Sequence, residues 1–364
     1  WARKWYGDDY QDEVMHRAGL VRDARQGKWE NLPAILDYLT GPGNSEVYVA
    51  SLVRLLAGCD DLRKWPALEQ AFSSESPLVR AAVVDGIALH PDRSRMLHLL
   101  LEAVRDDYRL VRVRAAAVLA EFPLEGVLAP GDEAAVEKGF AELEDALASR
   151  PDDWSSHYNL GNYQAGRGRY PEALEEYARA LRFRPGEIPV LVNQSMVYAR
   201  TGENGRAEDQ LRRAVEIEPG NEAACFNLGL LLAENGKPKE AEFYLREALR
   251  ADPGMAEAAH NLAVLISEDR LDEALALSRL AVRESPGNSR FRYTLSFFLH
   301  RKGRDSEAVD NLENLLERDP GYLSAYPLLG SLLEAAGRDS RAREIYLQAQ
   351  EQPGVNPRDR EYFR

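Results

Sequence analysis

The chain has 364 residues, of which 45% are hydrophobic and 29% charged, and its formal net charge is -14. This is the composition of a globular protein, which argues against disorder of the whole chain. No run approaches eighteen consecutive apolar residues, so we expect no membrane insertion. The acidic balance disfavours nucleic acid as a partner, because phosphate backbones would be repelled.

The first six residues of the opening segment WARKWYGDDY contain three aromatic side chains, Trp1, Trp5 and Tyr6. One interpretation is a short helix that packs these rings on the first helical pair. The sequence begins with Trp rather than Met, and no charged and apolar leader precedes the first helical pattern. We therefore expect a piece of a longer or processed protein, without a visible signal peptide.

A first pattern returns at a constant interval in the N-terminal half. It occupies three stretches: NSEVYVASLVRLLAG (44–58), SPLVRAAVVDGIALH (76–90) and YRLVRVRAAAVLAEF (108–122). One position of the repeat is occupied by Val47, Val79 and Val111, and a second position by Leu55, Ile87 and Leu119. Second helices are predicted between these stretches, at 62–74 and 92–106. The pattern resembles HEAT-type repeats, which implies stacked pairs of helices.

Two arginines share one offset in this first array. Arg80 and Arg112 occupy the place that Tyr48 holds in the first stretch. In HEAT-like stacks an arginine at this place commonly reaches an acidic group of the neighbouring repeat. We therefore interpret both arginines as structural, with Glu75 and Asp107 as candidate partners.

The segment FPLEGVLAPGDE (122–133) contains Pro and Gly and reads as a loop. EAAVEKGFAELEDALASRP (133–151) reads as one amphipathic helix that connects two arrays. The predicted domains are a HEAT-like domain at 1–130, a connecting helix at 131–153, a second array at 154–356 and a tail at 357–364.

A stricter repeat begins at residue 154. Its first copy contains NLGNYQAGRGRYPEALEEYARALRFRP (159–185), with fixed offsets at Leu160, Gly161, Gly168, Tyr170, Ala173, Tyr177, Ala180 and Pro185. The third copy, two repeat lengths later, has the following residues at the same offsets: Leu228, Gly229, Gly236, Pro238, Ala241, Leu245, Ala248 and Pro253. Six tandem copies can be aligned, the fourth with a slightly shorter turn. This resembles the tetratricopeptide repeat family over about 154–356.

The residue types have a physical explanation. The turn glycine accepts a positive φ after the first helix, and small residues let the two helices approach closely. The proline that ends each copy cannot continue a helix. One hairpin cannot bury its apolar stripe alone, so neighbouring hairpins must stack. The predicted fold is all-α, a right-handed α-solenoid of stacked helical hairpins in which a HEAT-like array precedes six tetratricopeptide units.

Catalytic and metal-binding motifs are not found. The six histidines show no HExxH spacing, and there is no GxSxG, CxxC or CxxCH. The segment AGRGR (165–169) is a repeat turn and not a phosphate loop. Cys59 and Cys225 lie in apolar helical runs and are expected to be buried thiols. We predict no enzymatic activity, no metal and no cofactor.

An asparagine recurs on the first helix of successive copies, the helix that lines the concave wall of such solenoids. The four positions, one repeat length apart, are Asn159, Asn193, Asn227 and Asn261. A similar asparagine ladder holds peptide backbone in the tetratricopeptide superhelix of O-linked N-acetylglucosamine transferases, which implies the same role here. The other interpretation is that each amide bonds to the neighbouring helix and fixes the repeat register. Thr294 and Leu328 replace asparagine in the last two copies.

Neighbouring positions predict a groove with an aromatic and apolar floor. The residues before the asparagines, or before Thr294, are Tyr158, Val192, Phe226, His260 and Tyr293. Those three positions after are Asn162, Met196, Leu230, Val264 and Phe297, and His300 and Arg301 follow in the fifth copy. Phe226 and Phe297 could instead belong to the interhelical core. Few Lys or Arg residues occupy these positions, so a C-terminal carboxylate ligand is not expected.

These features predict a scaffold that binds a protein or an extended peptide in the groove. A second hypothesis follows from layout: an aromatic WYG run, a HEAT-like array and then tetratricopeptides resembles bacterial multihaem c-type cytochromes that carry both repeats. Without haem motifs here, that resemblance implies a docking module of an exported, periplasmic or extracytoplasmic, electron-transfer protein. A cytoplasmic location stays open. A third hypothesis is a self-assembling structural array, and the oligomeric state is not predicted.

Overall fold

The computed structural model describes residues 10–122, 124 and 126–352. The aromatic run at Trp1, Trp5 and Tyr6 and the predicted tail at 357–364 lie outside these residues. The chain divides into two compact units, Trp1–Phe183 and Arg184–Arg364. Each unit is described by itself. The division falls inside the predicted 154–356 array, and the predicted domain bounds stay a prediction.

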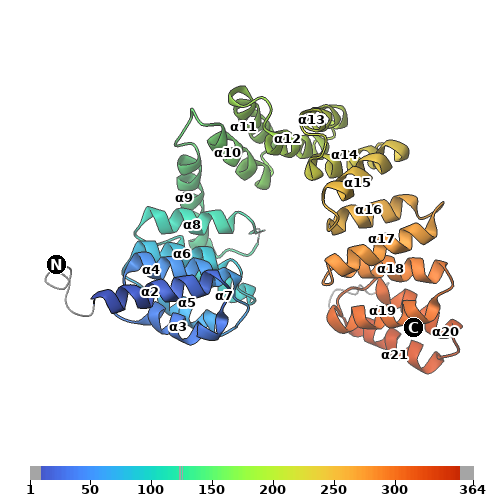
Figure 1. The fold of residues 1–364 in the computed structure, drawn as a ribbon, viewed down its shortest axis with the longest axis horizontal. Coiled ribbons are helices and arrows are strands. Elements are labelled where there is room, and N and C mark those ends of the chain that lie inside the picture. Colours follow the sequence, from blue (N-terminus) through green and yellow to red (C-terminus); the bar gives the residue numbers. More distant parts are fainter. Residues whose placement is uncertain (1–9, 123, 125, 353–364) are drawn as a thin grey trace. The chain divides into compact units, whose positions relative to one another are not determined.

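The first unit is built of helices, and those within residues 10–119 are arranged in two rows (Figure 1). They are α2 (Tyr10–Arg25), η1 (Trp29–Asn31), α3 (Leu32–Thr40), α4 (Glu46–Leu55), η2 (Leu56–Gly58), α5 (Lys64–Phe72), α6 (Pro77–Ile87), α7 (Arg93–Ala103), α8 (Arg109–Leu119), α9 (Pro130–Leu147), α10 (Trp154–Gly166) and α11 (Tyr170–Phe183). One row contains α2, α4, α6 and α8, each against the next. Helices α3, α5 and α7 pack against this row, and one core cluster runs through both rows.

The helices predicted between residues 44 and 122 are present in the structure as α4 to α8. Their repeated apolar positions are only partly equivalent. Val79 and Val111 are buried, whereas Val47 is 59% exposed. Ile87 and Leu119 are fully buried. The repeated pattern therefore describes α6 and α8 well and fails at the first turn of α4.

The two repeated arginines form equivalent interactions. Arg80 donates from Nε and Nη2 to the two carboxylate oxygens of Asp106, at 2.7 and 2.9 Å. Arg112 does the same to Glu142, at 2.9 and 2.7 Å. A structural role for the arginines is supported, but the candidate partners were wrong. Glu75 accepts from Nη1 of Arg80, and Asp107 accepts from Nη1 of Arg112, but each does so only through its backbone carbonyl.

Helix α9 is the predicted connecting helix, and it contacts both α8 and α10. It buries Val136, Phe140 and Leu143 on one face, as its amphipathic pattern predicts. Helices α10 and α11 form the first tetratricopeptide hairpin. The Tyr177 hydroxyl on α11 donates to Oδ1 of Asn162 on α10 at 2.8 Å, which ties the two helices together.

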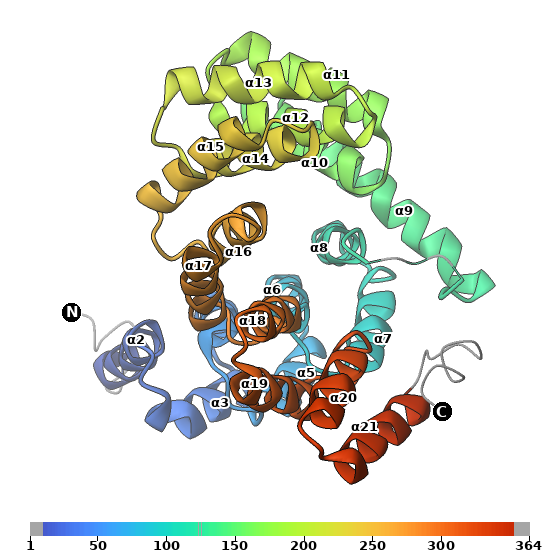
Figure 2. The same cartoon turned by 90° about the vertical axis from the view of Figure 1, so that its right-hand side faces the viewer.

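The second unit consists of five further hairpins. Their helices are α12 (Ile188–Arg200), α13 (Asn204–Ile217), α14 (Glu222–Glu234), α15 (Pro238–Ala251), α16 (Ala256–Ile266), α17 (Leu271–Glu284), α18 (Ser289–Arg301), α19 (Asp305–Arg318), α20 (Ala325–Ala335) and α21 (Asp339–Glu351). Each helix packs against the next, and α14 also contacts the first helices before and after it. Figure 2 shows α16 to α19 nearly end-on, as two adjacent hairpins. The described residues contain no strand, and the all-α solenoid of stacked helical hairpins is confirmed.

The turns have the conformation that the repeat predicts. Gly202 and Gly236 adopt φ values of 80° and 72° between the two helices of their hairpins, a region that favours glycine. Helix α13 ends at Ile217 and α15 at Ala251, each shortly before a repeat-ending proline. Turn chemistry thus sets the length of each hairpin and places equivalent residues at equivalent heights.

Ion pairs connect the second helices of successive hairpins, and the sequence pattern did not predict them. Arg212 on α13 donates to Glu240 on α15 at 2.7 Å. Arg246, the equivalent residue one repeat later, donates to Glu273 on α17 at 2.6 Å. The hydrogen bonds that Glu242 accepts from Arg270 lower the pKa of this carboxyl to about 2. The ladder links successive hairpins on their second helices and leaves the first helices for other contacts.

Candidate functional site: the first helices of the second unit

The asparagine row lies on successive first helices. Asn193 is on α12, Asn227 on α14 and Asn261 on α16, and all three are half-buried. Thr294 holds the equivalent place on α18 and is also half-buried. The fourth predicted asparagine, Asn159, is exposed on α10 and belongs to the first unit.

Two of these amides are held by their own helix. Nδ2 of Asn227 donates to the carbonyl of Ala223 at 2.8 Å, and Nδ2 of Asn261 donates to that of Glu257 at 2.7 Å. Among the described residues, neither amide forms a hydrogen bond to the neighbouring helix, although the register interpretation requires one. These bonds fix the rotamers of both side chains. Oδ1 of each amide makes no hydrogen bond to a residue within 10–122, 124 or 126–352.

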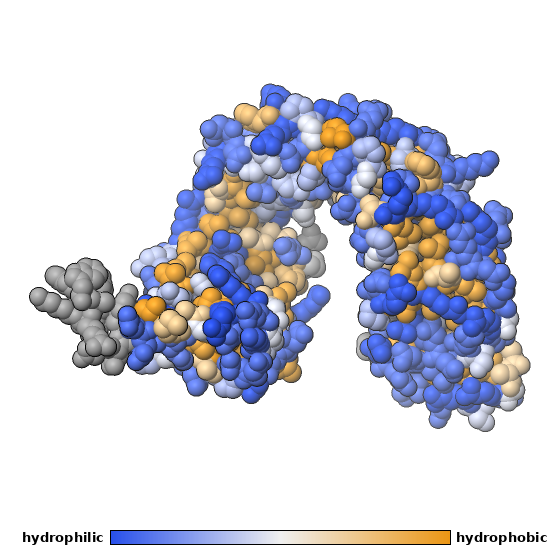
Figure 3. Space-filling view, in the orientation of Figure 1, coloured by the Kyte–Doolittle hydropathy of each residue, from blue (hydrophilic) through white to orange (hydrophobic). Residues whose placement is uncertain are grey.

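An apolar row accompanies the asparagines, three positions later on each first helix. It consists of Met196, Leu230, Val264 and Phe297, on α12, α14, α16 and α18. Met196 is 45% exposed, Val264 49% and Phe297 40%, while Leu230 is half-buried. The row ends at α20, where Ser331 takes the place. Figure 3 shows apolar surface over α16 to α18, bordered by polar surface.

The two rows meet in a hollow between α12, α13 and α14. It has a volume of about 160 Å³ and is lined by Met196, Leu230 and Asn227. Arg200 and Glu234 lie at the same hollow, both exposed to solvent. The hollow thus combines an apolar wall, a fixed amide and a charge of each sign.

Of the positions just before the asparagines or Thr294, two are buried and three are half-buried, which corrects the predicted groove. Val192 is 6% exposed and His260 only 3%. Phe226 is half-buried and packs against two core clusters. Tyr293 is half-buried beside Tyr322, with ring centroids 5.7 Å apart. Phe226 packs against residues of neighbouring helices, so the interhelical interpretation applies to Phe226 but not to the exposed Phe297.

His260 is a core imidazole with an unusual environment. Its ring lies 4.7 Å from that of Phe291 between centroids, and its Nε2 accepts a hydrogen bond from Nε of Arg290 at 3.2 Å. Because Nε2 is an acceptor, the proton lies on Nδ1, which is buried without a hydrogen-bond partner. Burial, and then the Arg290 charge, lower the pKa of His260 to about 4. His260 is therefore neutral at pH 7 and contributes packing.

The basic residues at the end of α18 already have partners. Arg301 donates to the two carboxylate oxygens of Glu268 at 2.9 and 3.2 Å. The His300 Nδ1 lies 2.7 Å from Oδ1 of Asp305. Both side chains are exposed, but each already contacts an acidic residue of the fold.

The remaining predicted groove residues belong to the first unit. Tyr158 is half-buried on α10, with its ring 6.1 Å from that of Trp154 and 6.4 Å from that of Tyr177. Asn162 accepts the Tyr177 hydroxyl bond described above. Both residues contribute to packing within the α10–α11 hairpin.

Groups for metal chemistry are not assembled in the described residues. No three His, Cys, Asp or Glu side chains there are grouped so that they could hold a metal ion. Cys59 and Cys225 are free and fully buried, as predicted. Among the same residues, no helix combines the length and apolarity needed to cross a bilayer.

The repeats identify the class of protein. A sequence model of the tetratricopeptide repeat family matches residues 141–188, 192–256, 226–289 and 301–357, together more than half of the chain. The chain therefore belongs to the tetratricopeptide repeat family. No match was found among curated proteins.

Solved structures of similar fold include PilF from Pseudomonas aeruginosa, at 18% sequence identity, over 59% of this chain and 98% of that one, with a TM-score of 0.51. YrrB, described as a tetratricopeptide repeat protein with an unusual peptide-binding site, is 22% identical over 50% of this chain and 94% of its own, with a TM-score of 0.40. MamA from Desulfovibrio magneticus RS-1 is 20% identical over 47% of this chain and 97% of its own, with a TM-score of 0.42. At these identities the likeness concerns the fold alone.

Proposed function

We propose that the second unit is a scaffold that binds an extended protein segment along its first helices. The observation that carries the proposal is the pairing of two rows at fixed offsets on consecutive first helices, with an asparagine on three of them and Thr294 on the fourth. One row offers amides whose rotamers are already fixed, at Asn227 and Asn261. The other offers exposed apolar side chains, at Met196, Val264 and Phe297. The proposed role needs no catalytic step.

An extended segment fits this spacing. Helices in contact lie about 8–10 Å apart, and an extended chain advances about 3.3 Å per residue. Successive asparagines would therefore meet about every third backbone unit of the ligand. Each amide offers Oδ1 and one further N–H, which match the donor and acceptor of a peptide group. The apolar row would contact ligand side chains between these points.

The stacked hairpins lower the cost of binding. Helix α14 contacts α12, α13, α15 and α16, so its exposed side chains are held on a packed element. Most of the ordering entropy then falls on the ligand rather than on the scaffold. The net charge of -14 favours a protein ligand over a nucleic acid.

The test uses peptides selected from a displayed library of short random sequences, bound to the whole chain. We expect the double variant Asn227→Ala, Asn261→Ala to weaken the selected peptides about tenfold or more, at about 1 kcal/mol for each lost hydrogen bond. Asn314→Ala is the matched control, because Asn314 is a half-buried asparagine on α19, a second helix. Equal affinities for the double variant and wild type would contradict the proposal.

The organisation of the N-terminal half is part of the same proposal. The two-row packing of α2 to α8 and the bidentate Arg80–Asp106 and Arg112–Glu142 pairs support a HEAT-like array at 1–130. Such an array would give the chain a second helical stack, joined to the tetratricopeptides through a connecting helix at 131–153. The cytochrome-like setting rests on Trp1, Trp5 and Tyr6, outside the described residues, and stays a prediction that upstream haem motifs would test.

A further inference from the structure

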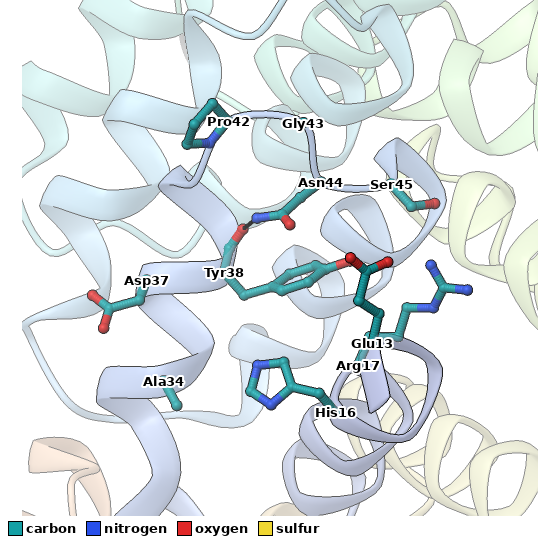
Figure 4. Close-up of a pocket in the computed structure, with 10 residues that line it drawn as sticks. All are labelled: Glu13, His16, Arg17, Ala34, Asp37, Tyr38, Pro42, Gly43, Asn44 and Ser45. Carbon is teal, nitrogen blue, oxygen red and sulfur yellow. Dashed lines mark hydrogen bonds between the residues drawn. The ribbon is translucent and has the colours of Figure 1, made fainter. Parts of the chain in front are cut away.

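A pocket in the first unit has no part in the proposed scaffold. It lies between α2, α3 and the loop that leads into α4, and its volume is about 520 Å³ (Figure 4). Small-molecule sites commonly have volumes of about 300–1,000 Å³. The lining mixes charged, aromatic and hydroxyl-bearing side chains, among them Arg17, Tyr38, Asn44 and Ser45.

Arg17 is the unusual group in this pocket. It is half-buried on α2, and its Nε is buried without a hydrogen-bond partner. Its guanidinium carbon lies 4.8 Å from the centroid of the Tyr48 ring, a cation–π contact that orients the group. Within the described ranges, no carboxylate forms an ion pair with it. By contrast, Arg80 and Arg112 each hold a carboxylate by two hydrogen bonds.

An arginine in this state is prepared for an anion. A guanidinium has five N–H donors in a fixed fork that matches the two oxygens of a carboxylate. Removing donors from water without supplying acceptors costs free energy, and a bound carboxylate would recover it. The cation–π contact engages the face of the guanidinium and not its edge, along which the N–H groups point.

The surrounding side chains restrict the ligand. Figure 4 shows the Tyr38 ring extending across the pocket, with the carboxylate of Glu13 and the guanidinium of Arg17 beyond its hydroxyl end. The amide of Asn44 is fixed by its bond to the Tyr38 carbonyl at 2.7 Å. Ser45 precedes α4 without a side-chain capping bond, so its hydroxyl can serve a ligand. The negative charge of Glu13 disfavours dianions beside Arg17.

We propose that this pocket binds a small monocarboxylate with an aromatic body. The carboxylate would accept the paired N–H groups of Arg17, and the aromatic ring would stack against Tyr38. Asn44 and Ser45 would meet polar substituents of the ligand. The site is independent of the second unit, and peptide binding by the asparagine row does not depend on it.

The experiment measures binding of benzoate and phenylacetate to the whole chain by saturation-transfer NMR and calorimetry. We expect Arg17→Gln to weaken binding about 10- to 100-fold, the range of a charged hydrogen-bonded pair. Arg17→Lys should lose most of this affinity, because the bidentate fork is lost while the charge is kept. Arg25→Gln, at an exposed position of the same helix, should bind as wild type does.

Glu13→Gln is expected to raise the affinity for benzoate, a result that a variant which merely fails to fold cannot produce. Removing the neighbouring negative charge should tighten benzoate binding several-fold. Inorganic phosphate should bind wild type more weakly than benzoate does. Absence of binding, equal affinity of Arg17→Gln and wild type, or a preference for phosphate would each overturn the proposal.

Discussion

Acidification is a direct test of the core position assigned to His260. The ring is 3% exposed, its Nε2 accepts from Arg290, and its pKa is lowered to about 4 from an ordinary value of 6.5. The unfolded chain therefore takes up this proton between pH 6.5 and 4, while the folded chain resists it. The contribution to stability is complete above pH 6.5 and is lost as the pH falls towards 4.

The size of the effect follows from the two pKa values. One unit of pKa difference corresponds to about 1.4 kcal/mol. The free energy of unfolding should therefore be lower than at neutral pH by about 2 kcal/mol at pH 5 and by about 3 kcal/mol at pH 4. Carboxyls with lowered pKa values act in a different range. Glu242, with a pKa of about 2, keeps its contribution above pH 4.5 and loses it only in stronger acid. The window from pH 6.5 to 4.5 therefore reports mainly on the imidazole.

Two measurements check this prediction. Ring-proton NMR shifts of the whole chain should give His260 a pKa near 4, and urea unfolding followed by circular dichroism should show the loss of about 2 kcal/mol at pH 5. His260→Phe should remove that part of the pH dependence. His98→Phe, at an exposed position on α7, controls for the loss of an imidazole. A His260 pKa of 6 or above would refute the reasoning.

Two further predictions concern stability, measured by urea unfolding. Arg112→Met should lower the free energy of unfolding by about 2–3 kcal/mol, because it leaves Glu142 largely buried without its cation. Adding Glu142→Gln should recover part of this loss. A double variant no more stable than Arg112→Met would contradict the pairing. Gly229→Ala should destabilise by about 1–3 kcal/mol, since its Cβ would lie 2.8 Å from the side chain and 3.2 Å from the backbone nitrogen of Leu245. Gly205→Ala, with nothing within 4 Å, should instead stabilise α13 by about 0.5–1 kcal/mol.

The repeat array could be predicted because local chemistry is repeated. A glycine such as Gly202 ends a first helix, and a proline such as Pro219 ends a second one. These signals act between near neighbours in the chain, so six copies in register predict both the hairpins and their stacking. The HEAT-like pattern is looser. It predicted the helices but misjudged Val47, and it predicted the ion-pair role of Arg80 without the correct acid.

The groove residues could be predicted less well, because side chains within one turn of the same helix can be either exposed or buried. The sequence placed both His260 and Phe297 in the groove, with Phe297 as the possible core residue, yet the packed hairpins bury His260 and expose Phe297. The ladder from Arg212 to Glu240 was also missed, since its partners lie on different hairpins. No sequence spacing signalled Arg17, whose pocket joins α2, α3 and the loop before α4.

The sequence by itself determined that the chain forms helical hairpins of nearly constant length, because turns and helix ends depend on neighbouring residues. It also placed equivalent side chains at equivalent heights on successive first helices. Only the tertiary structure decided which of those side chains remain at the surface, and which carboxylate each arginine binds. Burial and charge pairing depend on residues that belong to other helices, and their contacts exist only after the hairpins have packed.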